Sequence, residues 1–551
     1  MGGCVVAAGF LFLGPPPSAS DWPQFQYNAQ NHGRTDAPAV EPPYRLRWVW
    51  FGEGRVVVPR GGEHANGRFG PLPREPYGKL GFTMQGMVAD GRVLFGDLEG
   101  KLFCLDTRDG SEVWKAQLPG AIVHAVGIWK AGGDPGRNMI VVPCQDGGVY
   151  GLDWGGRQKW KVRGRRGFVT PAKISGSTAY LGSLDGSLYA VDIPTGRLAW
   201  KFDAGAPIRQ PCAIAGGRVF FGSEDMIFHA LDAKDGSEIW RTAPGQMKGQ
   251  SFRNTWPMAA GDKVLTFQIL VHGLAEFVME ALLWHATPGS PLGKTPAEQK
   301  RIEDWPKERE AILQWLQGDE TYAYSVEPPW SKTPGARRGD KTDPRERGGP
   351  FRKTLFVFNA ADGTEPYQVP MGIVGGTGNG NVLALDPQGR PVTFWRVSKA
   401  TVLKGGSFGT AFTPDLSALD LRTGDRLPYP AGPGGGPGVE LDNHHMLTSA
   451  GDVVYWFNPF RQARWIRLDG RNNPSGTISA VYGRHDGGGW GGDVVYWPTK
   501  EAAGPRAEVM IDTHGAARTP VVVADGALFV NELDIRAFAC YESAPQEGGK
   551  R

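Results

Sequence analysis

The sequence predicts an all-β protein, an eight-bladed β-propeller of four-stranded antiparallel blades with a helical insertion; seven or nine blades are alternatives. Two observations carry this prediction. One pattern recurs along the chain every 40 to 46 residues, and each copy alternates apolar and polar residues between turn residues. Glycine and proline, at 80 and 44 of 551 residues, make up more than a fifth of the chain. That content is typical of many short strands joined by turns.

The repeat is clearest between a glycine and a tryptophan that lie 18 residues apart, as at Gly182 and Trp200. An aspartate precedes each such tryptophan by eight residues. The best copies centre on Asp106, Asp192 and Asp232, and weaker copies centre on Asp153, Asn359, Asp420 and Asn458. A sheet of this size cannot bury both faces by itself, so the copies are expected to stack as wedges around an axis.

The last unit, residues 515–541, lacks a tryptophan strand, whereas RLRWVW at 45–50 precedes the first complete unit. This predicts an N-terminal segment, 21–50, that completes the last blade with Trp48, followed by the propeller over 51–545. The repeat tryptophans are expected to fill the widening space between neighbouring blades. They are Trp114, Trp160, Trp200 and Trp240.

Residues 272–350 lose the two-residue alternation of strands. Thr295, Pro296 and Glu298 form the start signal of a helix, with Thr295 as N-cap. The sequence therefore predicts a helical and flexible insertion within blade five, which is either functional or a tolerated decoration.

The N-terminus has an apolar run, 5–13, followed by the small residues Ser18, Ala19 and Ser20. This order predicts a signal peptide over 1–20, although the usual basic start is missing and an apolar tail on a cytosolic protein is the alternative. No later segment has the ~18 apolar residues of a membrane span. The expected location is therefore outside the cytoplasm, periplasmic or extracellular.

Charge and cysteine content exclude several classes of protein. Sixty basic against 57 acidic residues give a net charge of +3, which does not favour a nucleic-acid partner. Four cysteines lie in apolar runs without a CxxC pair, which excludes zinc ribbons and thioredoxin-like redox sites. They are Cys104, Cys144, Cys212 and Cys540. Disulfides and buried free thiols are both open for them.

The units YAVDIPTGRLAW and HALDAKDGSEIW resemble the PQQ-like repeat family, the quinoprotein alcohol dehydrogenase-like propellers. The stretch DWPQFQYNAQNHGRT, 21–35, is also similar to the segment that begins many exported bacterial members. The resemblance spans most of 21–545 and implies the propeller fold. It implies no single function, because the family holds both PQQ-dependent dehydrogenases and non-catalytic exported members such as the outer-membrane assembly propeller lipoprotein.

The enzyme branch of that family implies an adjacent Cys-Cys pair, a calcium ion bound by Glu, Asn and Asp, and an aspartate base. The chain has no Cys-Cys pair, and its turn aspartates fit a backbone-bonding role better. We therefore expect a non-catalytic exported scaffold, monomeric and without a cofactor, that binds a protein or a small polar ligand. A funnel-site oxidoreductase, dependent on PQQ and calcium or of another kind, is the alternative.

The first residues of the innermost strands are expected to line a funnel at one mouth of the ring, where propellers commonly bind ligands. The candidate ligand-binding residues are Thr170, Arg209, Gln210, Trp256, His445 and Thr519. The tryptophan would stack on a planar group while the others form hydrogen bonds; the alternative is that neighbours satisfy them. His444 and His445 adjoin on a strand and point to opposite faces, so no metal site is predicted.

Overall fold

The computed structural model describes most of residues 21–268 and a set of shorter segments from 355 to 543. The gaps within the first range are 41–43, 53–55, 58–76, 78, 82–83, 133, 248–250 and 253–254. The shorter segments are 355–367, 382–385, 391–397, 401–402, 408–409, 415–424, 426–427, 447–451, 453–458, 462–467, 477–479, 495–496, 508–509, 521–532 and 537–543.

Residues 87–241 form four successive antiparallel sheets of four strands, each in chain order from strand one to strand four. Blade one holds β4 (Met87–Ala89), β5 (Arg92–Gly96), β6 (Lys101–Asp106) and β7 (Glu112–Gln117). Blade two holds β8 (Gly127–Trp129), β9 (Met139–Pro143), β10 (Gly148–Asp153) and β11 (Gln158–Arg163). Blade three holds β12 (Lys173–Ser175), β13 (Thr178–Gly182), β14 (Ser187–Asp192) and β15 (Arg197–Asp203). Blade four holds β16 (Ala213–Ala215), β17 (Arg218–Ser223), β18 (Ile227–Asp232) and β19 (Glu238–Arg241).

The later segments form four further sheets of three to five strands. Blade five holds β20 (Met258–Ala260), β21 (Lys263–Phe267) and β22 (Leu355–Asn359). Blade six holds β23 (Val382–Leu385), β24 (Pro391–Val397), β27 (Asp415–Asp420) and β28 (Arg426–Leu427). Blade seven holds β29 (Leu447–Ala450), β30 (Val453–Asn458), β31 (Gln462–Arg467) and β32 (Thr477–Ser479), with β1 (Arg34–Thr35) beside β29. Blade eight holds β35 (Val522–Ala524), β36 (Ala527–Glu532), β37 (Ala537–Ser543), β2 (Tyr44–Trp50) and β3 (Val56–Val57).

Two short hairpins complete the described strands. They are β25 (Thr401–Val402) with β26 (Phe408–Gly409), and β33 (Val495–Tyr496) with β34 (Glu508–Val509). A single 3-10 turn, Pro135–Arg137, is the only helical element among the described residues.

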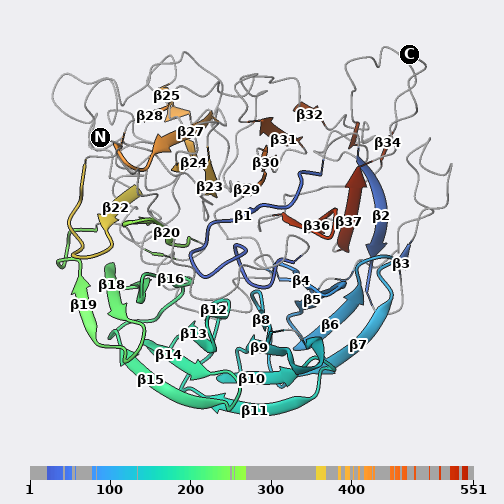
Figure 1. The fold of residues 1–551 in the computed structure, drawn as a ribbon, viewed down its shortest axis with the longest axis horizontal. Coiled ribbons are helices and arrows are strands. Elements are labelled where there is room, and N and C mark those ends of the chain that lie inside the picture. The colour runs from blue at the N-terminus through green and yellow to red at the C-terminus, as the bar shows by residue number, and fades with distance from the viewer. Residues whose placement is uncertain are drawn as a thin grey trace, which may run out of the picture.

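The sheets stand around a common axis, with the first strand of each blade innermost (Figure 1). Innermost strands of neighbouring blades lie side by side, and β35 of blade eight lies next to β4 of blade one. The all-β propeller predicted from the sequence is therefore confirmed. The number of blades in the whole chain stays a prediction.

Burial changes from the inside of a blade to its rim, because each blade is stacked between two others. Strand β14 is buried over Ser187–Val191, on both of its faces. The outermost strand β15 is exposed at every residue except Trp200 and the half-exposed Phe202. Near-continuous apolar runs therefore mark inner strands, and mixed charged sequence marks the rim.

The repeat tryptophans connect each blade to the next one, as the sequence predicts. Each indole N–H donates to the backbone carbonyl that follows the turn aspartate of the next blade, or Asn359 in the case of Trp240, at 2.7 to 3.1 Å. The pairs are Trp114 with Trp154, Trp160 with Ile193, Trp200 with Ala233 and Trp240 with Ala360. In blade five the hydroxyl of Tyr367 donates to Leu421 in the same way.

The turn that receives each tryptophan explains the constant spacing of aspartate and glycine within the repeat. The carboxylate of Asp232 accepts the backbone N–H of Lys234, and the N–H of Gly236 donates to the Asp232 carbonyl. Gly236 has a φ of +77°, and a Cβ there would lie 2.6 Å from the ring of Trp200. Glycine is thus required twice, for the left-handed backbone and for the ring that lies on it.

This double requirement predicts the result of a matched pair of substitutions. Gly236→Ala should destabilise the protein by about 2–4 kcal/mol, because it adds both a strained φ and a clash with Trp200. Gly245 has nearly the same φ, +78°, but no atom lies within 4 Å of the place that an added methyl group would take. Gly245→Ala should therefore cost only about 1 kcal/mol. Chemical denaturation of both variants measures the difference, and equal losses would mean that the tryptophan does not rest on the glycine.

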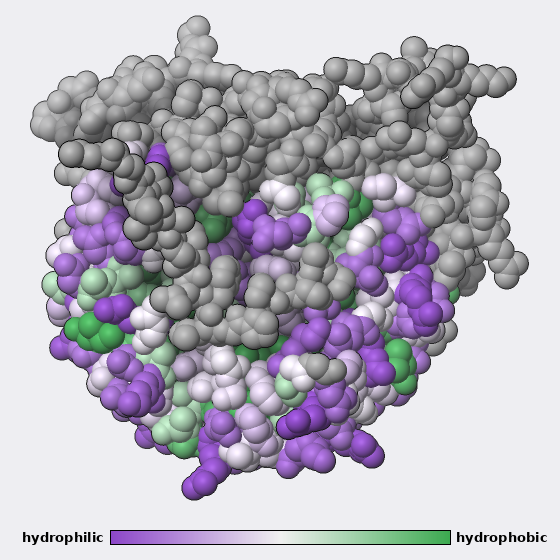
Figure 2. Space-filling view, viewed as in Figure 1, coloured by the Kyte–Doolittle hydropathy of each residue, from purple (hydrophilic) through white to green (hydrophobic). Residues whose placement is uncertain are grey.

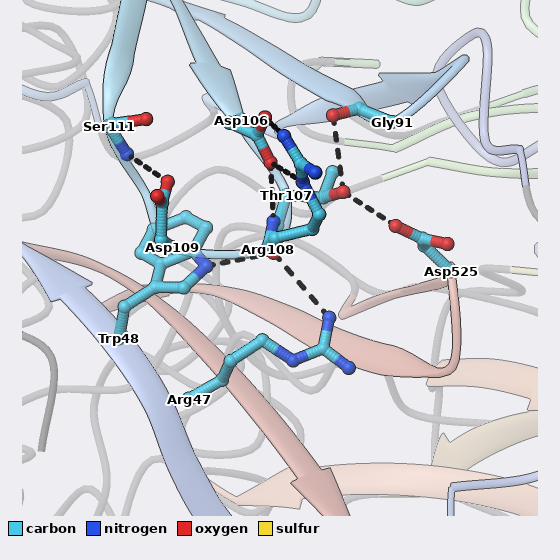
Figure 3. Close-up of polar contacts among 9 residues, drawn as sticks. All are labelled: Arg47, Trp48, Gly91, Asp106, Thr107, Arg108, Asp109, Ser111 and Asp525. Carbon is cyan, nitrogen blue, oxygen red and sulfur yellow. Dashed lines mark hydrogen bonds and ion pairs between the residues drawn. The ribbon is translucent and has the colours of Figure 1, made fainter. Parts of the chain in front are cut away.

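The N-terminal strand closes the ring, as predicted from Trp48. Strand β2 pairs antiparallel with β37, the third strand of blade eight, and thus supplies its fourth strand. Figure 3 shows the joint with blade one, where the indole N–H of Trp48 donates to the Thr107 carbonyl at 2.9 Å. The Thr107 hydroxyl donates to Asp525 at 2.5 Å, so blade eight also reaches blade one from a hairpin turn.

One strand assignment from the sequence is wrong. Asn458 ends β30, which is the second strand of blade seven, whereas the turn aspartates of blades one to four end third strands. Its resemblance to the turn residues is local, since an Asn after an apolar run marks any hairpin end. The predicted signal peptide, 1–20, and the predicted helical insertion, 272–350, lie outside the described residues.

Candidate functional site

The N-terminal segment lies in the middle of the ring, where the sequence predicts a ligand funnel. We call residues 21–35 the belt; they are the dark blue trace at the centre of Figure 1. Gln26 and Asn31 are fully buried, and Trp22 is too. The belt therefore forms part of the protein interior rather than a tail on its surface.

The belt bonds to the innermost strands of seven blades in the order in which they follow each other. Trp22 pairs with Val88 of β4, Pro23 with Ile128 of β8, Gln24 with Ile174 of β12, Ala29 with Ile214 of β16, Gln30 with Ala259 of β20, His32 with Leu383 of β23, and Gly33 with Ser449 of β29. These hydrogen bonds measure 2.7 to 3.1 Å. They occupy backbone groups on the strand edges that face the axis, which would otherwise require water.

The path of the belt requires an unusual backbone. Gln26, Tyr27 and Asn31 have φ values of 55°, 71° and 59°, in the left-handed region that ordinary residues seldom adopt. Gly33, at φ 59°, leaves no room for a side chain, since a Cβ would lie 2.5 Å from the Gln26 amide oxygen. Such conformations persist only where many contacts hold them, as the bonds to the blades do here.

Aromatic and cationic side chains pack around Phe25 inside the ring. The rings of His124 and Trp256 approach Phe25 edge-on at 4.9 and 5.1 Å. The ammonium group of Lys173 lies 5.9 Å from the centre of the same ring. Elements far apart in the chain, β12 and the segments before β8 and β20, thus meet on one belt residue.

Lys173 anchors the belt to blade three. Its Nζ donates to the carbonyl of Phe25 and, at 2.7 Å, to the carbonyl of Asn28, and the side chain is fully buried. Burial lowers the pKa of Lys173 to about 7, because no carboxylate accompanies the charge. This lysine thus holds the belt against blade three through two hydrogen bonds to belt carbonyls.

Two buried histidines near the axis are held neutral. The Nε2–H of His32 donates to the Ala259 carbonyl at 2.7 Å, while its Nδ1 accepts from the Asn28 amide at 3.0 Å. The Nδ1 of His124 accepts the backbone N–H of Ala125 at 2.9 Å. Burial lowers the pKa of His32 to about 4 and that of His124 to about 3. Both rings therefore act as neutral parts of the interior.

These histidines predict a loss of stability in mild acid. At a pH below 6.5 but above these lowered pKa values, the two histidines are protonated in the unfolded chain and neutral in the folded one. The free energy of unfolding therefore falls as the pH drops through this window. The slope should reach about 1.4 kcal/mol per pH unit for each histidine. Denaturation of wild type and His124→Phe at pH 7, 6 and 5 measures this slope. An unchanged slope in the variant would contradict a neutral, buried His124.

Two of the predicted ligand-binding residues are used by the blades themselves. The hydroxyl of Thr170 donates to the Gly182 carbonyl and accepts the Gly182 N–H. The amide oxygen of Gln210 likewise accepts the N–H of Gly222, twelve residues on, and its nitrogen donates to Thr255 and Thr266. Both side chains are buried, so each connects the start of its blade to the second strand.

The other predicted residues differ in position. Arg209 is buried and lies 3.9 Å from the Glu224 carboxylate. Trp256 is buried against Phe25, and its indole N–H has no hydrogen-bond partner within the described part of the chain. His445 and Thr519 lie outside the described residues. Ligand binding by these six residues stays a prediction.

Comparison with known proteins gives the family of the repeats. The model of a family described as outer membrane protein assembly factor BamB (PQQ_2) matches residues 71–170 and 145–273. Together with the repeat pattern, this match confirms the resemblance found in the sequence. Residues 71–273 are therefore similar to the PQQ-like repeats of this family. No curated protein sequence matches it.

Three solved structures are similar to this chain. BamB from Moraxella catarrhalis has 14% identity over 83% of this chain and 96% of its own, with a TM-score of 0.44. The computationally designed Ika8 protein has 10% identity over 84% and 96%, with a TM-score of 0.46. Quinohemoprotein alcohol dehydrogenase ADHIIG from Pseudomonas putida HK5 has 12% identity over 97% and 82%, with a TM-score of 0.47.

One cluster in blade four has the residue types of a serine hydrolase. The Ser223 hydroxyl lies 3.2 Å from Nε2 of His229, whose Nδ1 lies 3.1 Å from Glu238. However, Ser223 is fully buried and its hydroxyl lies closer, at 2.6 Å, to the Asp225 carboxylate. A hydroxyl has a single hydrogen, so the Ser223 O–H that donates to Asp225 does not donate to His229, as activation by a general base would require.

The place of His229 in the repeat gives a structural explanation for this cluster. His229 of β18 occupies the place of Tyr189 in β14 and Tyr150 in β10. Both tyrosine hydroxyls donate to an aspartate in the turn before the third strand, at 2.6 Å to Asp185 and at 2.7 Å to Asp146. In blades two to four this position thus contains a polar aromatic side chain, and in blades two and three it bonds to the turn before its strand.

The described residues also include four cysteines. Cys104, Cys144, Cys212 and Cys540 are buried free thiols, which settles the choice left open by the sequence. Burial raises the pKa of Cys104, Cys144 and Cys212 to about 12, so these thiols stay protonated. The described residues contain no group of three or more His, Cys, Asp or Glu side chains placed to bind a metal ion. They also contain no helix that is long and apolar enough to span a membrane.

Proposed function

We propose that this PQQ-like propeller is an exported, non-catalytic scaffold that binds a protein partner through the outside of its ring. The observation that carries the proposal is the belt, which bonds to seven innermost strands at the place where a propeller ligand would bind. The polar groups of Thr170, Gln210 and Lys173 form hydrogen bonds within the protein itself. A partner is therefore expected to contact the rim of the blades.

Export and protein binding are supported by the sequence and by the family description. The matched family is described as an outer membrane protein assembly factor, which is a protein-interaction role outside the cytoplasm. The small residues before Asp21 fit a cleavage site, and Asp21 is buried, with its carboxylate 2.6 Å from the Lys130 ammonium. Cleavage after Ser20 would leave Asp21 as the first residue of the folded ring.

Two measurements test this proposal. Expressed with its own leader in a Gram-negative host, the chain should be found in the periplasmic fraction with Asp21 as its N-terminus. Incubated with PQQ and calcium and then desalted, the purified protein should show no quinone absorbance and no dye reduction with alcohols or sugars. Retained quinone with turnover would replace the scaffold by the PQQ-dependent oxidoreductase that the family resemblance leaves open.

A further inference from the structure

The rim of blade two has an uninterrupted run of positive charge. Between residues 155 and 166 the chain has six basic side chains and no acidic one. They are Arg157, Lys159, Lys161, Arg163, Arg165 and Arg166, and all six are exposed. Four of these lie on or immediately before β11, the outermost strand, and two lie in the turn after it. Figure 2 shows strongly hydrophilic side chains along this part of the rim, at the bottom of the view.

Half of this charge is balanced by the protein and half is not. Arg157, Lys161 and Arg165 lie 3.1, 3.1 and 4.0 Å from the carboxylates of Asp153, Asp146 and Asp185. Lys159, Arg163 and Arg166 have no ion pair with any residue that the structure describes. Three exposed, uncompensated cations therefore remain on one strand and its following turn.

The other outermost strands of the first four blades do not share this pattern. Each includes an acidic residue: Glu112 in β7, Asp203 in β15 and Glu238 in β19. A single exposed lysine is enough to keep a strand edge from pairing with another edge, so protection of the edge does not require six cations. Among these four blades the excess of positive charge is specific to blade two, and protection of the edge does not explain it.

We propose that the rim of blade two is a docking surface for an extended, acidic segment of a partner protein. This proposal rests on the scaffold function above and specifies the chemistry of its partner. Carboxylates of such a segment would lie against Lys159, Arg163 and Arg166. The exposed apolar side chains Val113 and Leu198 lie on the outermost strands of the two flanking blades, at 44% and 46% exposure. They offer contacts for apolar residues at the ends of the segment.

The shape of the basic surface favours a peptide over a membrane or a nucleic acid. The six residues of β11 span roughly 20 Å at ~3.3 Å per residue, about the length of a short extended segment. A flat anionic membrane would require cations in one plane across several blades, whereas these follow a single strand on a convex rim. A DNA duplex of the same length would need a broader field of charge than one strand provides.

A charge-reversal experiment tests the surface. The basic-rim variant Lys159→Glu/Arg163→Glu/Arg166→Glu is compared with a control, Arg197→Glu/Lys234→Glu/Arg241→Glu, which makes the same charge change at exposed positions of blades three and four. The probe is a fluorescent octapeptide of alternating glutamate and threonine, with a glutamine–threonine peptide as the uncharged reference. Binding is measured by fluorescence anisotropy at low and at physiological salt, on full-length folded protein checked by thermal melting.

We expect wild type to bind the acidic peptide, more weakly at higher salt, and to ignore the uncharged one. The basic-rim variant should lose at least tenfold in affinity while the control changes less than twofold. No binding by wild type, or equal losses in both variants, would overturn the proposal. Binding to anionic phosphatidylglycerol vesicles or to a DNA duplex that depends on the same three residues, without peptide binding, would also overturn it. Failed export or PQQ turnover would instead contradict the scaffold function and leave the peptide result standing.

Discussion

Deletion of the belt, residues 21–35, is expected to abolish the cooperative unfolding transition of the propeller. The belt supplies backbone or side-chain hydrogen bonds to seven innermost strands, and it buries Trp22 and Phe25 in the interior. At about 1 kcal/mol for each hydrogen bond and about 2–3 kcal/mol for each large apolar side chain, the loss is on the order of 10 kcal/mol. That is comparable with the whole stability of a typical domain.

A specific effect of the belt can be distinguished from a general effect of truncation by adding the belt back as a peptide. A synthetic peptide of residues 21–35 added to the deleted protein should restore a thermal transition in a concentration-dependent way, because binding to the folded state stabilises it by mass action. The same peptide with Phe25→Ala and Gly33→Val should restore little, since Phe25 packs on Trp256 and Gly33 has no room for a side chain. A deleted protein that melts like wild type would show that the blades need no central segment.

The repeat made the fold predictable because its residues act between identical neighbours. Blades one to four each use a tryptophan at the same position, and the turn that receives it has an Asp or Asn and a glycine at fixed spacing, so the sequence pattern and the packing have one period. Trp48 could be assigned to blade eight because the last unit lacks a tryptophan strand while RLRWVW precedes the first complete unit. Asn458 was misplaced because the end of a hairpin was taken for the turn that receives the tryptophan. The sequence after Asn458 has neither the glycine four residues on nor the tryptophan eight residues on that mark this turn in the best copies.

The centre of the ring was not predictable in the same way. The belt occurs once, its contacts are mostly backbone carbonyls, and its left-handed Gln26, Tyr27 and Asn31 leave no signal that sequence patterns report. Thr170 and Gln210 were expected to line an open funnel, but each stands twelve residues before the glycine to which it bonds. That spacing, repeated in two blades, is a structural signal present in the sequence. Polar residues at strand starts therefore indicate a site only when no periodic partner accounts for them.

Trp48→Ala is the second change expected to have a large effect, because it acts at the seam where the two ends of the chain meet. Trp48 has no exposed surface, packs on Phe529 and Phe538 with ring centres 6.1 and 6.3 Å away, and donates its indole N–H to Thr107. Loss of the indole should lower the free energy of unfolding by about 3–5 kcal/mol through the cavity it leaves, and the lost hydrogen bond adds about 1 kcal/mol.

The size of this effect should depend on the seam as well as on the side chain. Trp160 makes the same indole contact, to Ile193, between blades two and three, but those blades are also joined by the continuous chain. The chain also leads from β2 of blade eight to β4 of blade one, but within blade eight β2 is not joined to β37 by a hairpin, and only their pairing closes the ring. Trp48→Ala should therefore lower the melting temperature more than Trp160→Ala and make the protein elute as larger species, because an open seam exposes strand edges that pair between molecules. Trp48→Phe, which keeps most of the apolar volume and lacks the N–H, separates the two contributions. If Trp48→Ala and Trp160→Ala melt alike and both stay monomeric by size-exclusion chromatography, the belt alone holds the ring closed and the outer seam is secondary.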